Sequence, residues 1–214
     1  MKYTILPDSD IKVSKICLGS MTWGQQNSEK EGHEQIEYAL EQGINFIDTA
    51  EMYSVPANKD TQGSTEKIIG SWFKKSGKRN NRKDEIGLTE IYHRENVGLF
   101  PYSPLGMGSL SGKYLKDKNA PGRLTLFPQY GRYGNPQAVK AIEKYVSVAE
   151  KHNLNPSQMA LAFVNTRPFV TSTIIGATTM KQLQENIGSI NVDLTEAVLK
   201  EINDIHEAIP NPAP

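Results

Sequence analysis

An aspartate and a tyrosine stand five residues apart where the pattern predicts the end of a buried strand. Asp48 lies near the end of the apolar run 44–49, and Tyr53 follows in the next loop. A tyrosine hydroxyl, with an ordinary pKa of about 10, can donate a proton to a carbonyl oxygen if nearby cations lower that pKa, and a buried aspartate can hold such a cation. The pair could serve acid catalysis. Equally, Asp48 could cap a turn and Tyr53 could fill the rim of the fold.

A second segment combines glycines with a lysine. Residues 101–108 leave a predicted strand and enter a glycine-rich loop, and Lys113 follows shortly after. Glycines would let backbone amides approach a pyrophosphate, and Lys113 would add positive charge. Because glycine-rich loops are common in proteins, this feature alone does not assign a ligand.

A third segment runs from a β-branched strand, residues 170–176, directly into a helix that begins at Met180. The first-turn amides and the dipole of such a helix favour a phosphate group. Gln182, Glu185 and Asn186 share one face of that helix and could contact an adenine and its ribose. An ordinary capped surface helix would carry the same residue types, so that alternative stays open.

Hydrophobic patterning predicts the elements that position these segments. In chain order we expect a hairpin from residues 2–6 and 11–14, a buried strand at 16–19, a helix from Ser28 to Glu41, a strand at 44–49 and a helix from Ser64 to Lys75. Ser28 with Glu31 forms a capping box for the first helix, and Gly43 ends it. This order is typical of a right-handed parallel α/β unit.

The rest of the chain predicts mostly helices. We expect them at residues 85–95, 137–151, 156–165, 180–189 and 195–208, with strands at 98–103 and 170–176. The sequence predicts no strand between the helix that ends at Lys75 and the helix at 85–95. The alternation of strand and helix is therefore broken there.

Composition limits the class of protein. The 214 residues carry 24 basic and 24 acidic side chains, a balance that does not favour nucleic acid or an anionic membrane as partners. The single Cys17 cannot form an internal disulfide, and we expect it to be buried and unreactive in a cytoplasmic protein. No apolar run is long enough for a membrane helix.

The sequence does not predict a metal site. The spacing of the four histidines does not match that of metal ligands, so we expect them at solvated helix positions: His33, His93, His152 and His206.

Taken together, these segments resemble the aldo-keto reductase family, in particular its Tas-type bacterial members and the potassium-channel beta subunits. The resemblance is carried by residues 19–24, 43–53, 102–105, 111–114 and 176–187. It implies an α/β fold, a (β/α)8 TIM barrel of aldo-keto reductase type whose N-terminal hairpin closes the bottom, as a single domain over residues 1–214.

The resemblance also implies an activity: an NADP(H)-dependent oxidoreductase that reduces aldehydes or ketones to alcohols by hydride transfer. Tyr53 would be the proton donor, and Asp48 would pair with a lysine that lowers the tyrosine pKa. The residues matching the family's NADP-binding positions are Ser103, Leu105, Gly108 and Lys113 at the pyrophosphate, Arg123 as the nucleotide-gripping arginine, and Gly176, Thr178, Gln182, Glu185 and Asn186 at the adenosine end with its 2′-phosphate.

The resemblance breaks in the middle of the chain. The family's catalytic tetrad also needs a lysine at the end of the third strand and a histidine at the end of the fourth, and neither has a counterpart here. Family strands three to six would fall between Asn80 and Asn81. The remaining strands correspond to one, two, seven and eight, which are neighbours in a closed barrel, so we expect a contiguous half with two open edges.

Three explanations of this break stay open: a longer natural polypeptide that contains the central strands, a deleted or decayed gene, and an engineered half-barrel. The alternative to a carbonyl reductase is therefore an NADP-binding protein without turnover, either a sensor or an inactive remnant. A small-molecule carbonyl substrate is expected as the partner. An oligomer is possible, because two half-barrels could close one ring by pairing their open edges.

Overall fold

The computed structural model describes residues 1–76 and 98–213. They form two compact units, each described by itself: Met1–Tyr102 with Pro168–Ile187, and Ser103–Arg167 with Gly188–Pro214. The predicted helix at 85–95, the junction of Asn80 with Asn81, and His93 lie outside the described residues. The single domain over residues 1–214 stays a prediction.

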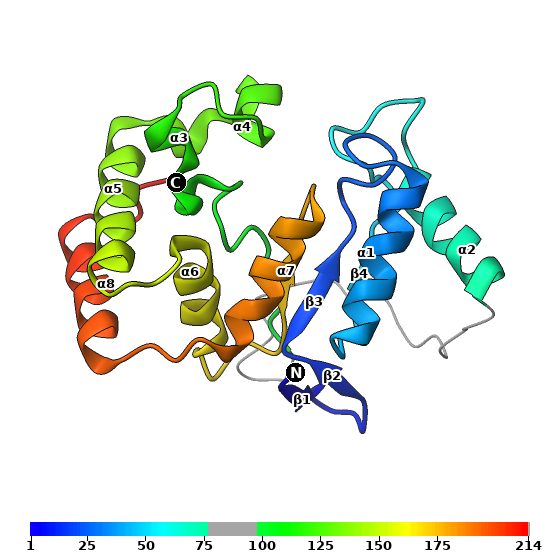
Figure 1. Ribbon diagram of the computed structural model, residues 1–214, viewed down its shortest axis with the longest axis horizontal. Helices are drawn as coiled ribbons and strands as arrows, with labels where there is room; N and C mark the ends of the chain where they lie inside the picture. Colours follow the sequence, from blue (N-terminus) through cyan, green and yellow to red (C-terminus); the bar gives the residue numbers. More distant parts are fainter. Residues whose placement is uncertain (77–97, 214) are drawn as a thin grey trace. The chain divides into compact units, whose positions relative to one another are not determined.

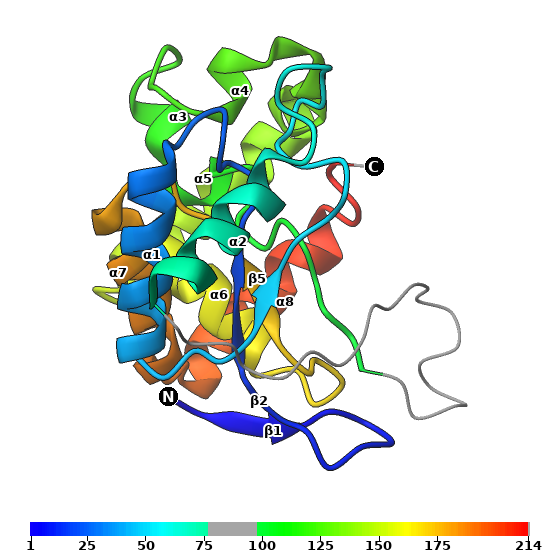
Figure 2. The ribbon, with the colours of Figure 1, turned by 90° about the vertical axis from the view of Figure 1, so that its right-hand side faces the viewer.

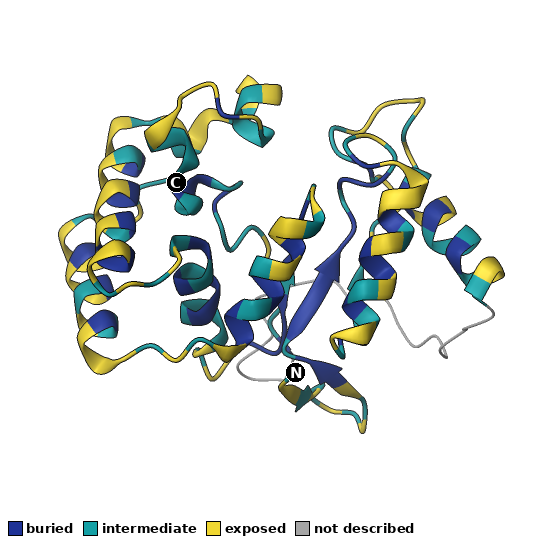
Figure 3. Cartoon of the chain, in the orientation of Figure 1, coloured by how far each residue is buried: buried dark blue, intermediate teal, exposed yellow. Residues whose placement is uncertain are grey.

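The first unit is built around a parallel sheet whose central strand is β3 (Ile16–Gly19) (Figure 1). β4 (Ile47–Asp48) pairs with one edge of β3 and β5 (Thr173–Ile175) with the other. All of β3 is buried (Figure 3), as expected for an apolar strand in a sheet covered on both faces.

A further segment continues this sheet beyond β5. Leu99 forms an isolated parallel bridge with Val170, and the amide of Ile174 donates to the carbonyl of Pro101 at 3.2 Å. The strand predicted at 98–103 is reduced to these contacts, because Pro101 has no amide to donate to a ladder. The order β4, β3, β5 and then this segment confirms a contiguous part of a barrel.

The N-terminal hairpin lies at the N-terminal ends of the parallel strands, as predicted. β1 (Tyr3–Ile5) pairs antiparallel with β2 (Lys12–Ser14). The Ser172 hydroxyl donates to the carbonyl of Ser14 at 2.7 Å, and the amide of Ser14 donates to the side-chain oxygen of Asn45 at 2.8 Å. The hairpin is thus bonded to the chain just before β4 and just before β5.

The strand predicted at 44–49 is shorter than expected, since only Ile47 and Asp48 join the ladder. The amide of Ile44 donates to the last turn of the preceding helix at Ala39, at 2.9 Å. The side chain of Asn45 bonds the hairpin instead. Ile44 is therefore used to end a helix, and Asn45 is used to hold the hairpin.

Helices α1 (Glu29–Glu41) and α2 (Ser64–Ser76) pack side by side in the first unit (Figures 1 and 2). The predicted capping box is present, because the Ser28 side chain accepts from the Glu31 amide and the Glu31 side chain accepts from the Ser28 amide. α7 (Met180–Gly188) follows β5 after a short loop. These helices confirm the predicted boundaries to within one or two residues.

The second unit is helical. Its core joins α5 (Pro136–Lys151), α6 (Pro156–Asn165) and α8 (Glu196–Ala208), each with one buried face (Figure 3). The core residues are Val148, Ala149, Met159, Val198, Ile202 and Ile205. Five short helical turns that the sequence did not predict are η2 (Ser109–Ser111), α3 (Lys113–Lys116), α4 (Arg123–Leu126), η3 (Pro128–Gly134) and η4 (Ser189–Asn191). Across residues 1–76 and 98–213, no helix is both long and apolar enough to cross a membrane.

The closeness of β3 to β5 generates a stability prediction at Gly19. A Cβ there would lie 2.8 Å from the Ile175 carbonyl oxygen and 2.9 Å from the Ile174 side chain. We expect Gly19→Ala to lower the free energy of unfolding by about 1–3 kcal/mol, the cost of overpacking a core. Urea denaturation measures it.

Gly70 in α2 is the matched control, because an added Cβ there meets no atom within 4 Å. Gly70→Ala should raise the free energy of unfolding by about 0.5–1 kcal/mol through helix propensity. Equal effects of the two changes would contradict the close approach of β3 to β5.

Candidate functional site

Asp48 and Tyr53 come together at the C-terminal end of β4. Asp48 is the last residue of the strand, and the Tyr53 hydroxyl donates a hydrogen bond to its carboxylate. Burial raises the pKa of Asp48 above its ordinary value, and this hydrogen bond opposes the rise. Both residues are half-buried, at the end of the strands where barrels place their active sites.

The backbone of Asp48 is held from β3. Asp48 stands opposite Gly19 in the ladder, and the Ser20 hydroxyl donates to the Asp48 carbonyl at 2.6 Å. Cys17 is fully buried, as expected, and burial together with the Asp48 carboxylate raises the pKa of its thiol. Cys17 therefore stays a neutral thiol.

In the second unit, the glycine-rich loop turns through left-handed backbone conformations. Ser103, Gly106, Gly108 and Gly112 have φ of 53°, 54°, 88° and 78°. The amide of Gly108 donates to the carbonyl of Leu105 at 3.0 Å, and that of Gly106 to Ser103 at 2.8 Å. Three of the predicted pyrophosphate residues, Ser103, Leu105 and Gly108, thus lie in one tight turn.

Lys113, at the start of α3, lies between two glycines. A Cβ on Gly108 would be 3.4 Å from its Cε, and a Cβ on Gly122 would overlap its Nζ. The ammonium group donates to the Pro121 carbonyl at 3.0 Å. Arg123 begins α4 directly after Gly122. The absence of side chains on both sides of Lys113 fits a pyrophosphate that approaches the backbone.

In the first unit, Thr178, in the loop before α7, is bonded to Gln182, in the first turn of α7. The Thr178 amide and hydroxyl donate to the Gln182 side-chain oxygen at 2.9 and 3.0 Å. Gly176 is exposed, and a Cβ there would meet no atom within 4 Å. Two converging donors beside an open glycine fit a phosphate group.

Glu185 and Asn186 occupy the same helix as Gln182 but differ in exposure. Gln182 is exposed, Glu185 is half-buried, and Asn186 is only 3% exposed. The Asn186 amide donates to the Gly176 carbonyl at 3.2 Å. Asn186 therefore faces the junction of strand and helix, and its contact with adenine stays a prediction.

The predicted site residues divide between the two units. The first unit holds Asp48, Tyr53, Gly176, Thr178, Gln182, Glu185 and Asn186, and the second holds Ser103, Leu105, Gly108, Lys113 and Arg123. Within each unit the residues of one predicted role lie together. The binding of one nucleotide by both groups stays a prediction.

Two amide side chains that bond the loop before α7 were not predicted from the sequence. Asn27 donates to the Thr178 carbonyl at 3.0 Å, and Gln35 donates to the Ala177 carbonyl at 3.2 Å. The partners are 151 and 142 residues apart in the chain. No local pattern signals a contact over such a separation.

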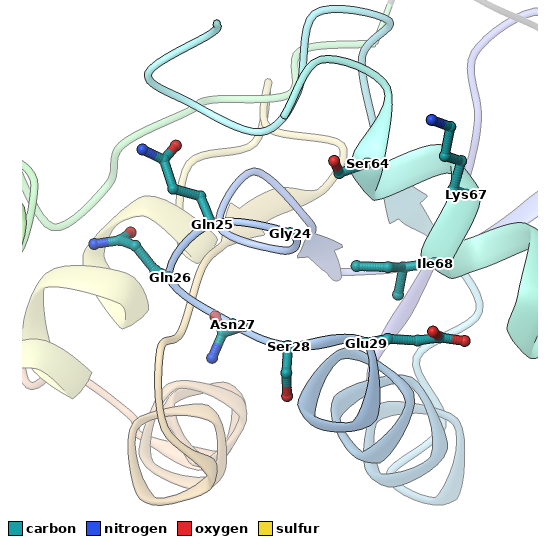
Figure 4. A pocket seen from close by; sticks show the side chains of 9 residues that line it. All are labelled: Gly24, Gln25, Gln26, Asn27, Ser28, Glu29, Ser64, Lys67 and Ile68. Atoms are coloured by element: carbon teal, nitrogen blue, oxygen red, sulfur yellow. The ribbon is translucent and has the colours of Figure 1, made fainter. Parts of the chain in front are cut away.

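A shallow pocket of about 510 Å³ lies at the N-terminal ends of α1 and α2. Gln25 and Gln26 extend away from its opening, and Ile68 projects from α2 toward it (Figure 4). Lys67 and Glu29 add opposite charges to the lining. This mixture does not indicate a class of ligand.

Two of the histidines differ from the expected solvated positions. His33 Nε2 lies 3.0 Å from the Ser71 hydroxyl, and His152 Nε2 lies 2.9 Å from Glu201, so both rings join neighbouring helices. His152 caps α5 rather than lying within it, whereas His206 is exposed on α8 as predicted. In the described ranges, no three His, Cys, Asp or Glu side chains are grouped to hold a metal ion.

Comparison with known proteins connects this geometry to one family. The family model described as the Aldo/keto reductase family matches residues 15–86 and 80–207. Protein tas of Escherichia coli (strain K12) is 32% identical over 346 aligned positions that include the whole of both chains. Because this chain has 214 residues, at least 132 of those positions have no residue in it.

Two further likenesses agree. A probable voltage-gated potassium channel subunit beta of Arabidopsis thaliana is 31% identical over 134 residues, which are 60% of this chain and 41% of that protein. The solved structure of a glycerol dehydrogenase from Gluconobacter oxydans superposes with a TM-score of 0.71 at 17% identity, over 99% of this chain and 97% of that one. The likeness to the glycerol dehydrogenase structure shows the fold alone, a (β/α) barrel.

The bond between Tyr53 and Asp48 generates a prediction about acidity. Tyr53→Phe should raise the pKa of Asp48 further, because it removes the hydrogen bond that stabilises the carboxylate. Carbon NMR of the carboxyl groups, followed through a pH titration, measures the change. Tyr102→Phe is the control, since Tyr102 is 75% exposed, and it should leave Asp48 unaffected. An unchanged pKa in Tyr53→Phe would mean that the bond is absent.

Proposed function

The chain belongs to the aldo-keto reductase family, a family of oxidoreductases, and on that premise we propose that it binds NADP(H) and reduces an aldehyde or ketone to an alcohol. Tyr53 is the proposed proton donor. The observation that carries the proposal is the hydrogen bond from Tyr53 to Asp48 at the C-terminal end of β4.

NADPH, when bound, supplies the hydride that adds to the carbonyl carbon. The chain supplies the proton: the O–H bond of Tyr53 breaks and a new O–H bond forms on the carbonyl oxygen of the substrate. Asp48 orients the tyrosine ring beforehand by accepting its hydrogen bond. The resemblance assigns the lowering of the tyrosine pKa to a lysine that has no counterpart in this sequence.

The residues of both units fit the charges of the cofactor. Lys113 would bind its pyrophosphate, and Arg123 would bind the 2′-phosphate together with Thr178 and Gln182. Lys113 lies between glycines, and Gly176 leaves the loop before α7 open. The proposal includes a small carbonyl substrate, which the family implies, and a cytoplasmic location, which suits a chain whose single cysteine, Cys17, cannot form an internal disulfide.

A second candidate function is NADP(H) binding without turnover. It is favoured by the alignment with protein tas, in which at least 132 positions have no residue in this chain. The resemblance places the family's lysine and histidine among those positions. Without them, Tyr53 retains Asp48 as a partner, but the resemblance gives it no lysine that would lower its pKa and make it an effective acid.

Cofactor selectivity tests the binding part of the proposal. We expect NADPH to bind more tightly than NADH. Arg123→Ala should weaken NADPH binding by on the order of 1–3 kcal/mol and NADH binding much less, because a charge-assisted contact with the 2′-phosphate is lost. Calorimetric titration measures both affinities.

Arg167→Ala is the matched control, since the Arg167 guanidinium stacks 4.3 Å from the Phe163 ring in the same unit. It should leave both affinities unchanged. If Arg123→Ala weakens NADPH and NADH equally, Arg123 does not contact the 2′-phosphate.

Turnover separates the two candidate functions. A chain with a verified mass of 23.8 kDa is given NADPH and a test aldehyde, and the loss of NADPH absorbance is followed. For a reductase, Tyr53→Phe should abolish turnover and leave NADPH affinity nearly unchanged, with Tyr102→Phe as the control. NADPH binding without turnover in the unaltered chain would support the second candidate, whereas turnover in Tyr53→Phe would exclude Tyr53 as the acid.

A further inference from the structure

Three consecutive peptide carbonyls between β5 and α7 are each bonded by a side-chain amide. The contacts are those of Asn186 with Gly176 at 3.2 Å, Gln35 with Ala177 at 3.2 Å and Asn27 with Thr178 at 3.0 Å. We call Asn27, Gln35 and Asn186 the carboxamide clamp. All three side chains are at least 97% buried.

The clamp draws its members from separate elements. Asn186 lies on α7, Gln35 lies on α1, and Asn27 lies in the loop between β3 and α1. Gln35 uses both ends of its amide, because its oxygen accepts from the Trp23 indole at 3.0 Å. The Trp23 indole, the Gln35 side chain and the Ala177 carbonyl thus form a chain of buried hydrogen bonds, and consecutive hydrogen bonds in such a chain polarise and strengthen one another. The loop before α7 is therefore fixed to α1 as well as to α7.

At Asn27, only the side-chain nitrogen takes part in the clamp. Its nitrogen bonds Thr178, while its oxygen is buried with no hydrogen-bond partner among the described residues. An orphaned buried acceptor destabilises the fold. An apolar side chain would avoid that cost, so the asparagine is explained by the amide that it donates.

The clamp determines which way the loop amides face. In a trans peptide, a carbonyl and the amide of the next residue point in opposite directions. Each of the amides of Ala177, Thr178 and Thr179 is therefore directed away from the clamp residue that bonds the carbonyl before it. The Thr178 amide, whose peptide carbonyl is bonded by Gln35, donates to the Gln182 oxygen, as does the Thr178 hydroxyl.

We propose that Asn27 and Gln35 are positioning residues for a nucleotide 2′-phosphate, acting through the loop at 176–178. They hold the loop so that the Thr178 donors converge, and a phosphate oxygen takes the place of the Gln182 side-chain oxygen. This inference rests on the proposed binding of NADP(H). It assigns a role in selectivity to two residues that do not touch the nucleotide.

The test compares two ligands that differ in one phosphate: 2′,5′-ADP carries the 2′-phosphate, and 5′-AMP lacks it. Asn27→Leu and Gln35→Met keep the approximate size of each side chain and remove the donor. Gln35→Met also removes the acceptor of the Trp23 indole, so Asn27→Leu is the cleaner of the two variants. Each should weaken 2′,5′-ADP binding about five- to tenfold, as expected for one lost hydrogen bond, and leave 5′-AMP binding nearly unchanged. Calorimetry on the full chain gives the affinities.

Asn45→Leu is the matched control. The Asn45 amide donates to the Lys12 carbonyl at 2.8 Å and so also ties a side chain to backbone, but at the hairpin. Hydrogen exchange supplies a second measurement that requires no ligand: amides in 176–182 should exchange faster in Asn27→Leu and Gln35→Met, and at the normal rate in Asn45→Leu.

Should the buried changes prevent folding, Gln182→Glu tests the same geometry at an exposed residue. A carboxylate beside the Thr178 donors should weaken 2′,5′-ADP and spare 5′-AMP. Equal losses for both ligands would show a general tether and overturn the inference, as would unchanged binding in the clamp variants while NADPH still binds. Failure of the unaltered chain to bind either 2′,5′-ADP or NADPH would overturn the proposed function together with the inference.

Discussion

Strand β3 pairs with a neighbour on each edge, and the site residues of the first unit depend on that pairing. Asp48 ends β4, and Gly176 follows β5, so both positions are set by the register of one buried strand. Gly19 keeps the strands close, because a larger residue would press on Ile174 and Ile175. The acid pair and the loop before α7 are thus held on a common support.

Sequence patterning predicted the elements whose signals are local. The capping box of Ser28 and Glu31 defined the start of α1, and regular apolar spacing defined α5, α6 and α8. The strand at 44–49 was predicted too long, because Asn45 bonds a hairpin that lies far away in the chain. Tertiary contacts of this kind override strand propensity. The strand at 98–103 was overestimated because Pro101 interrupts the ladder.

The candidate site was predictable in its contiguous motifs and unpredictable in its supports. Asp48 with Tyr53, and Thr178 with Gln182, are close in sequence, so their proximity follows from the strand and helix that carry them. Asn27 and Gln35 contact residues more than a hundred positions away. The environment of His33, likewise, depends on α2 lying beside α1. Such contacts require the packed fold.

The burial of Cys17 has a consequence for how the sheet can be observed. Its thiol lies in the middle of β3, fully buried and paired opposite Ile174, and it is the only cysteine of the chain. A thiol reagent can therefore reach it only when the strand separates from its neighbours. Under native conditions the modification rate reports the free energy of that opening. The chain therefore needs no added label, because the modification rate of Cys17 measures how often β3 separates from its neighbouring strands.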